Sequence, residues 1–123
     1  MAYVTGFLLA VPAANKEAYR TMAEKAWKVF RDHGCLAMRE NWEADVPGGT
    51  VTSFPMAVKK EADEVVVFSW LEWPDRATCD RAWAAMKKDP DMAEMGEMPF
   101  DGRRMMWGHF EELLRVDARE TAA

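Results

Sequence analysis

The strongest constraint in this sequence is that three of its predicted strands carry apolar side chains on both faces. Successive side chains of a strand point to opposite faces, so a sheet with one wet face alternates apolar and polar residues. Segments 3–11, 64–73 and 104–116 do not alternate in this way; Phe68, for example, lies on one face of its strand and Val67 on the other. We therefore expect both faces of the sheet to be covered.

Chain breakers and periodic segments predict the order strand, helix, strand, hook, strand, helix, strand. The first helix starts at Asn15, a fair N-cap, and ends before Gly34; the second starts after Asp75. A short helical hook is favoured within the long connection 45–63, because Pro55 opposes a strand there. The predicted strands are residues 3–11, 35–44, 64–73 and 104–116.

This order predicts an α+β protein with the ferredoxin-like βαββαβ plan. Two halves, each with a crossover helix of one hand, give a four-stranded antiparallel sheet with both helices on one face. We expect a second copy of the chain to cover the other face, forming a dimeric α/β barrel. The alternative is a monomer in which segments 45–63 and 90–102 fold over that face. Residues 1–116 form the expected single domain, and 117–123 a frayed tail.

Charge and cysteine content exclude several classes of function. The net charge is −5 and the basic residues are interspersed with acids, which argues against nucleic-acid binding, and nothing indicates membrane binding. Cys35 and Cys79 lie in apolar periodic segments, which predicts buried free thiols and a reducing cytoplasm. We expect no metal site, because His33 and Cys35 lack the partner pair that zinc needs, and no cofactor.

The ten Met and six Trp residues indicate a wide, irregular core or a ligand pocket. Aromatic side chains on the strands would line a cavity for a flat apolar ligand if they share the interior face. Plain packing at a subunit interface is the alternative interpretation. The predicted ligand-binding residues are Phe7, Trp42, Phe68, Trp70 and Trp107.

No catalytic signature stands out, but four residues are candidates. His109 and Glu111 share one face of the last strand and form a pair suited to proton transfer, although a surface histidine is the favoured interpretation. Asp101 and Arg104 follow a rigid turn, and Glu72 lies on the same strand face as Trp70. The polar face of the second strand, with Arg39, Asn41 and Glu43, is typical of an edge strand or of a pocket rim.

The chain contains several distinctive motifs, among them Val67-Phe68-Ser69-Trp70-Leu71-Glu72-Trp73-Pro74 and Met98-Pro99-Phe100-Asp101-Gly102. With these motifs it resembles the YbaA-like family of small bacterial proteins of unknown function, placed in the dimeric α/β-barrel superfamily. The resemblance covers nearly the whole chain. It implies a dimeric barrel and no established activity. The family pattern has Gly at the position of His109, which argues against a shared role for that residue; if a shared site exists, Trp42, Asp45, Trp70, Glu72, Asp101 and Arg104 are better candidates. The other motifs are Val11-Pro12 with Asn15 and Tyr19, Trp42 with Asp45-Val46-Pro47, and Phe54.

Two functions fit the sequence. One is a cytoplasmic homodimer that binds a small, partly aromatic molecule in its interior; the wider superfamily suggests cofactor-independent monooxygenase or isomerase chemistry for such a site. The other is a non-catalytic module for stress response or protein interaction, favoured by the lack of a convincing acid–base or nucleophile pair. The fold alone does not choose between them.

Overall fold

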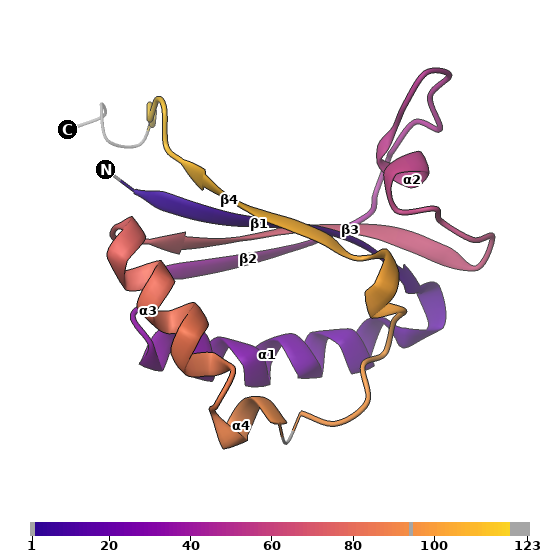
Figure 1. Ribbon diagram of the computed structural model, residues 1–123. Helices are drawn as coiled ribbons and strands as arrows, with labels where there is room; N and C mark the ends of the chain where they lie inside the picture. Colours follow the sequence, from indigo (N-terminus) through magenta and orange to yellow (C-terminus); the bar gives the residue numbers. More distant parts are fainter. Residues whose placement is uncertain (1, 94, 119–123) are drawn as a thin grey trace.

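The protein is built on one open, four-stranded antiparallel sheet with the strand order β2-β3-β1-β4 (Figure 1). The computed structural model describes residues 2–93 and 95–118. This is the predicted ferredoxin-like plan, and the sheet of a single chain is not closed into a barrel. The strands are β1 (Tyr3–Pro12), β2 (Ala37–Trp42), β3 (Glu64–Trp73) and β4 (Met106–Glu111).

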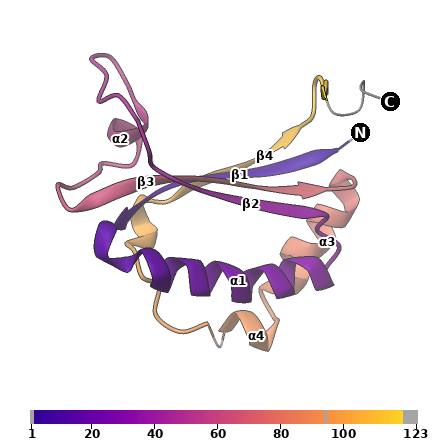
Figure 2. The same ribbon diagram turned by 180° about the vertical axis from the view of Figure 1, so that it is seen from behind.

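Two helices, α1 (Lys16–Asp32) and α3 (Arg76–Met86), cover one face of the sheet (Figures 1 and 2). Gly34 ends the first crossover with a φ of 102°, where an added Cβ would lie 2.6 Å from the Thr78 side chain. Asp75 caps α3 by accepting a 2.7 Å hydrogen bond from the Thr78 backbone N–H. No helix in the described ranges is long and apolar enough to cross a membrane.

Asn15 precedes α1 as predicted, but its side chain does not cap the helix. Its amide instead donates a 2.9 Å hydrogen bond to the carbonyl of Pro99, far along the chain. Tertiary contact with the 95–101 segment has therefore replaced the local bond that the sequence pattern predicted.

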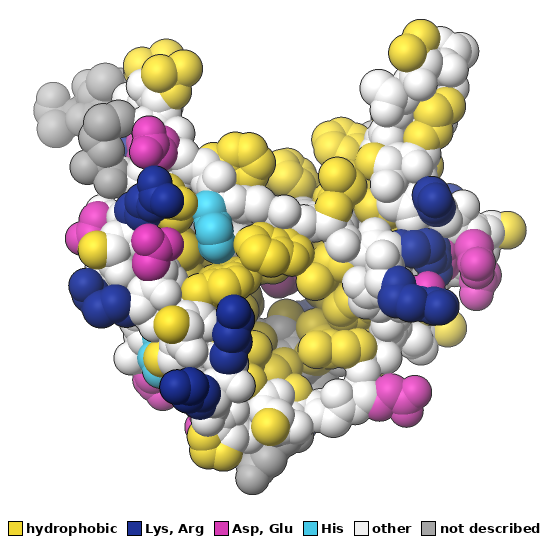
Figure 3. Space-filling view, viewed as in Figure 1, with side chains coloured by type: hydrophobic (Ala, Val, Ile, Leu, Met, Phe, Trp, Pro, Cys, Tyr) yellow, Lys and Arg dark blue, Asp and Glu magenta, His cyan; other side chains and the backbone are white. Residues whose placement is uncertain are grey.

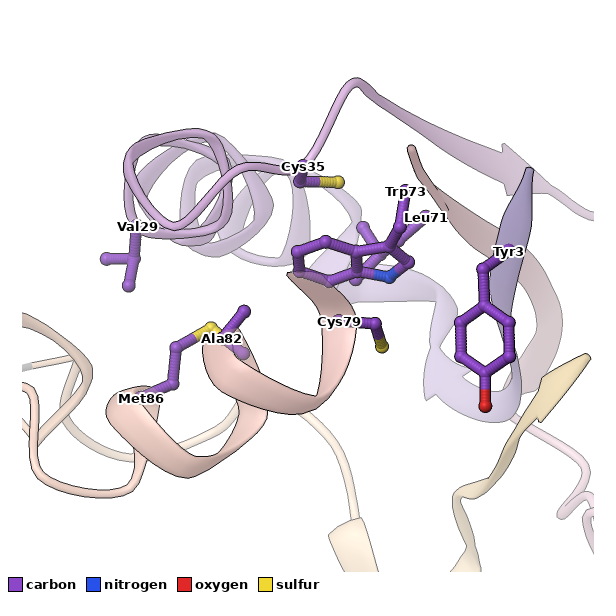
Figure 4. Packing of buried hydrophobic residues seen from close by; sticks show 8 residues of the cluster. All are labelled: Tyr3, Val29, Cys35, Leu71, Trp73, Cys79, Ala82 and Met86. Atoms are coloured by element: carbon purple, nitrogen blue, oxygen red, sulfur yellow. The ribbon is translucent and has the colours of Figure 1, made fainter. Parts of the chain in front are cut away.

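The strand register assigns each side chain to one of two faces. Thr5 pairs with Leu71 and Leu9 with Val67, so the odd-numbered residues of β1 and β3 face the helices. This helix-facing side holds the main core, including Trp73, which is fully buried (Figure 4). The even-numbered residues of both strands point to the opposite side, which we call the open face.

Two segments project beyond the open face, one at each end of the sheet (Figures 1 and 2). One is the connection between β2 and β3, which contains the hook α2 (Phe54–Ala57); the other is the chain after β4. Ser53 caps the hook by accepting a hydrogen bond from the backbone N–H of Met56. Val58 then packs against Ala10 and Val66, so the hook covers one end of the open face.

Two strands are shorter than predicted. The second begins at Ala37 and ends at Trp42, so both ends of the predicted 35–44 span lie outside it. The last begins at Met106, because the Asp101 carboxylate accepts a hydrogen bond from the backbone N–H of Arg103 and starts a 3₁₀ turn, η2 (Gly102–Arg104). Beyond Glu111 the chain leaves the sheet; of the predicted tail, residues 119–123 lie outside the described residues.

Candidate functional site

A cavity of about 320 Å³ lies between the helix-facing side of the sheet and helices α1 and α3. In Figure 3 it is the hollow at the centre of the molecule, surrounded by hydrophobic side chains. This volume is at the lower end of the range typical of small-molecule sites. Methionines and aromatic residues form most of its wall: Met22, Met86, Met92, Met95, Met98, Met105, Phe7, Tyr19, Phe30, Trp70, Trp83 and Phe100.

The segment between α3 and β4 forms one side of this cavity. It contains the short helix α4 (Pro90–Ala93), which lies below α1 and α3 in Figure 1. Met92 and Met98 reach the cavity from this segment. The segment thus lies against the helices and not over the open face, where one alternative of the sequence analysis had placed it.

A polar pair interrupts the apolar wall of the cavity. The Tyr19 hydroxyl, from the buried side of α1, donates a 2.7 Å hydrogen bond to Oε1 of Glu40 on β2. Ser69 stands directly opposite Glu40 in the register of β2 and β3 and is itself buried. All three residues line the cavity.

The surroundings of Glu40 raise the pKa of its carboxyl. The side chain keeps solvent access, but the protein encloses it on several sides, and this desolvation outweighs the stabilisation by the Tyr19 and Ser69 hydroxyls. Burial and the nearby carboxylate raise the pKa of Tyr19 well above its ordinary range. Tyr19 therefore stays a neutral hydrogen-bond donor, and Glu40 is a better proton acceptor than a fully solvated carboxylate.

A second hollow, of about 400 Å³, lies on the other side of the same pair. Its wall is more polar and includes Lys16 and Arg20 of α1 together with Asn41 and Trp42 of β2. The Lys16 ammonium lies 5.5 Å from the centroid of the Trp42 ring, within the range of a cation–π contact. Tyr19, Ala23 and Glu40 line both hollows, so they form the partition between them.

His109 lies in a hydrogen-bonded network under the helix-facing side of β4. Its Nδ1 is 2.9 Å from Thr5 Oγ1, which also accepts a 3.0 Å hydrogen bond from the Trp73 indole N–H. The Trp83 ring packs edge-on against the imidazole at a centroid distance of 4.8 Å. This face points to α3, and His109 is half-buried against it.

A cysteine also approaches this histidine, with Cys79 Sγ 3.7 Å from Nδ1. Cys79 is fully buried, and burial raises the pKa of its thiol, as it does for Cys35. A neutral buried thiol is a poor nucleophile, so the contact is one of packing. Both cysteines are free and buried, as predicted.

The predicted ligand-binding aromatics divide between the two faces of the sheet. Phe7, Trp42 and Trp107 lie on the helix-facing side, whereas Phe68 and Trp70 extend from the open face, where their ring centroids are 5.4 Å apart. Phe7 lines the cavity, and Trp70 contributes to its wall from β3. The five residues therefore do not share one interior face.

Three candidate catalytic residues form ion pairs away from the cavity. Arg104 holds Glu64 through two 2.7 Å hydrogen bonds, which lower the pKa of the Glu64 carboxyl. Arg103 and Arg104 both hydrogen-bond to Asp101 and lower the pKa of its carboxyl. The Glu72 carboxylate oxygen Oε1 lies 3.2 Å from the guanidinium nitrogen Nη1 of Arg115. None of these three residues lines the cavity, so the structure does not bring these candidates together with the predicted aromatic residues there.

Sequence reasoning missed Tyr19 and Glu40 as a site. Tyr19 recurs at helical spacing with the apolar residues Met22, Ala26 and Phe30, a pattern that predicts a buried stripe on α1. Glu40 belongs to a strand that was interpreted as a polar edge. The available signal was that Glu40 shares a strand face with Trp42, because a carboxylate on an aromatic, helix-facing side needs a hydrogen-bonding partner. Tyr19, a hydroxyl within an otherwise apolar stripe, is that partner. Within residues 2–93 and 95–118, no three His, Cys, Asp or Glu side chains are grouped as metal ligands would be.

The sheet order and the paired helices define an α+β protein of the ferredoxin-like class. A solved structure titled as a dimeric ferredoxin-like protein, from an uncultured marine organism, matches with a TM-score of 0.53 at 14% identity and covers 94% of this chain and 100% of that one. At this identity the match shows the fold alone.

Residues 2–102 match the family described as "Protein of unknown function (DUF1428)", and the chain belongs to this family. Uncharacterized protein YbaA of Escherichia coli K12 is 53% identical over 115 residues, which cover 93% of this chain and 98% of that protein. The Shigella flexneri protein of the same description has the same identity and coverage. These matches confirm the family resemblance seen in the sequence motifs.

Proposed function

We propose that this protein is a homodimer that binds a small, partly aromatic molecule in the cavity between its sheet and its helices. The observation that supports binding is an apolar cavity with one polar pair, Tyr19 and Glu40, in its wall. Ligand sites typically combine apolar walls with a few placed polar groups. A hollow of about 320 Å³ has room for a small molecule.

The lining favours a ligand of irregular or flat shape. Methionine thioethers are unbranched and polarizable, so they adapt to different ligand outlines and pack well against aromatic rings. Aromatic surface comes from two different segments of the chain: Trp83 lies on α3, and Phe100 lies in the loop before η2. Oxygenase chemistry and isomerase chemistry would both use the same cavity, so either activity requires that a ligand binds there.

A dimer is proposed because the open face is apolar and exposed. Phe68, Met106 and Phe110 are each about half exposed or more, with 46%, 49% and 61% of their surface accessible. An apolar patch across a sheet is unusual on a monomer. Figure 3 shows hydrophobic side chains along the upper side of the sheet, between the two projecting segments.

A second copy is the occupant that these features favour. Both projecting segments carry exposed apolar side chains, Val51 on one and Leu114 on the other. A two-fold axis through the open face would seat each sheet between the projecting segments of its partner, with one patch serving both subunits. A structural neighbour is titled as dimeric, which supports a dimer for this chain as well.

Native mass spectrometry tests the dimer. The wild type should show twice the mass of one chain, and Phe110→Asp should shift the population to monomer because it places a charge on the apolar patch. Ala18→Asp, which adds the same charge to the exposed side of α1, should remain dimeric. A wild-type monomer at micromolar concentration, with native circular dichroism, would overturn this part of the proposal.

Methionine-methyl NMR tests the cavity. Naphthalene should shift the methyl signals of Met22, Met86 and Met98, which line the cavity, and leave the open-face Met106 unchanged. Ala26→Leu should abolish these shifts, because Ala26 lines the cavity and the larger side chain fills it.

Ala18→Leu, the same substitution on the exposed side of α1, is the matched control and should bind as the wild type does. Shifts confined to Met106 and Met56, or no shifts at all, would contradict ligand binding in the cavity. That result would favour the non-catalytic interaction module instead.

A further inference from the structure

We propose that Glu40 is the ligand-recognition residue of the cavity and that it selects neutral aromatic molecules bearing a hydroxyl or amino group. That group would donate a hydrogen bond to the Glu40 carboxylate. The inference rests on the proposed function and specifies the chemical class of the ligand. Tyr19 acts as the positioning residue that holds the carboxylate in place.

The hydrogen-bonding pattern of the pair leaves acceptor capacity directed at the cavity. Tyr19 donates its single hydroxyl proton to Oε1 of Glu40, and the Ser69 hydroxyl stabilises the same carboxylate. An ionised carboxylate has about four acceptor positions. Two neighbouring hydroxyls leave roughly half of these free, and Glu40 contributes to the cavity wall.

The same pattern disfavours other ligand classes. A ligand with only acceptor groups would find the nearby Tyr19 hydroxyl already directed at Glu40. An anionic ligand in the cavity would approach the negative charge of the Glu40 carboxylate along a mainly apolar wall, and like charges repel. Among the described residues of the wall, Lys87 is the one cation, and it lies exposed at the end of α3.

The position of Glu40 in the partition gives its carboxylate a route to solvent that avoids the cavity. It faces the second, more polar hollow as well, so it can exchange protons with water while a ligand fills the apolar side. Because enclosure raises the pKa of Glu40, protonation should occur above the usual range of a glutamate. The protonated form loses acceptor strength, so preference for donor ligands should fall as the pH is lowered. The other charged or titratable groups around the pair are Lys16, Glu17, Arg20 and Glu24 of α1, and Lys87 directly after α3.

Two matched probes test the inference: 2-naphthol, which donates a hydrogen bond, and 2-methoxynaphthalene, which has the same rings and oxygen but no donor. Dissociation constants would be measured by methionine-methyl NMR between pH 4.5 and 8. The wild type should bind 2-naphthol on the order of tenfold more tightly at pH 7.5, as expected for a hydrogen bond to a charged acceptor. That preference should decline toward the acidic end.

Glu40→Gln should remove most of the preference and its pH dependence, because the amide has half the acceptor capacity and adds donors of its own. Tyr19→Phe should retain a reduced preference, as expected when the carboxylate remains but loses its positioning partner. Glu111→Gln makes the same chemical change at an exposed residue of β4 and should match the wild type.

Three results would overturn the inference. Equal affinity of the wild type for both probes would do so while leaving ligand binding in place. So would a preference that persists unchanged and independent of pH in Glu40→Gln. If neither probe, nor naphthalene, shifts the cavity methionines, the proposed function fails together with the inference.

Discussion

The two faces of the sheet carry similar numbers of apolar side chains but differ in what covers them. The helix-facing side buries Leu9, Leu71 and Trp73 under α1 and α3, whereas Phe68 and Phe110 on the open face keep about half of their surface exposed. Only the helix-facing side is covered by elements of the same chain. The comparison teaches that hydrophobicity predicts burial without specifying which partner provides it.

The faces also differ in their polar groups. On the helix-facing side, buried Thr5 accepts a hydrogen bond from buried Trp73, and buried Tyr19 donates one to the more exposed Glu40. The open face has a buried charged residue of a different kind, Glu64, at the end of the sheet that the hook covers. Its carboxylate forms an ion pair with the Arg104 guanidinium. Function and stability should therefore respond differently to substitutions on the two sides.

The largest expected effect comes from Trp73→Ala on the helix-facing side. The substitution removes a fully buried indole and should lower the free energy of unfolding by about 4 kcal/mol. Phe68→Ala, its counterpart on the open face, should cost little at low protein concentration and more at high concentration, because its burial depends on a second chain.

Urea denaturation at two protein concentrations measures both substitutions. A concentration-independent loss for Phe68→Ala that equals the loss for Trp73→Ala would erase the distinction between the faces.

A smaller effect is expected from Thr5→Val, a nearly isosteric change at a fully buried position. It removes the oxygen that accepts the hydrogen bond of the Trp73 indole and contacts His109. An unpaired buried N–H should lower the free energy of unfolding by about 2 kcal/mol. Thr50→Val, in the exposed β2–β3 connection, serves as the control. Equal stability of both variants in thermal unfolding would mean that the network contributes nothing.

The smallest effect is the pH-dependent contribution of Glu64. Arg104 holds the pKa of Glu64 below its ordinary value of 4.5, so the folded state binds this proton less readily than the unfolded state. The stabilisation is present above pH 4.5 and is lost as the pH falls through the folded-state pKa. Glu64→Gln should therefore make the free energy of unfolding flatter with pH below 4.5, measured by urea denaturation from pH 7 to pH 3. A slope as steep as that of Glu111→Gln would contradict this assignment.

Much of the fold was predictable because its signals are local. The third strand was predicted with its observed bounds, since the run from Glu64 to Trp73 is rich in β-branched and aromatic residues and Pro74 follows it. The hook was predicted from Pro55 and is observed as α2. The last strand was predicted too long, because the η2 turn depends on Asp101 and on contacts to distant Glu64.

The candidate site was much less predictable. Alternation correctly grouped His109 with Glu111, and Glu72 with Trp70, but it does not say which group faces the helices. Strand pairing settles this, because the register of β1 with its two neighbours aligns residues far apart in the chain. The Tyr19–Glu40 pair depends on the way α1 crosses β2 and has no signature in either segment alone.

The sequence by itself determined the element order, the ferredoxin-like plan, the buried free cysteines and the two-sided apolar character of the strands. These follow from propensity and periodicity, which act over a few neighbouring residues. Only the tertiary structure decided which face the helices cover, where space is left between the layers and which polar groups meet there. The physical reason is that cavities and hydrogen-bonded pairs depend on packing between distant segments, and the same local pattern is compatible with several such packings.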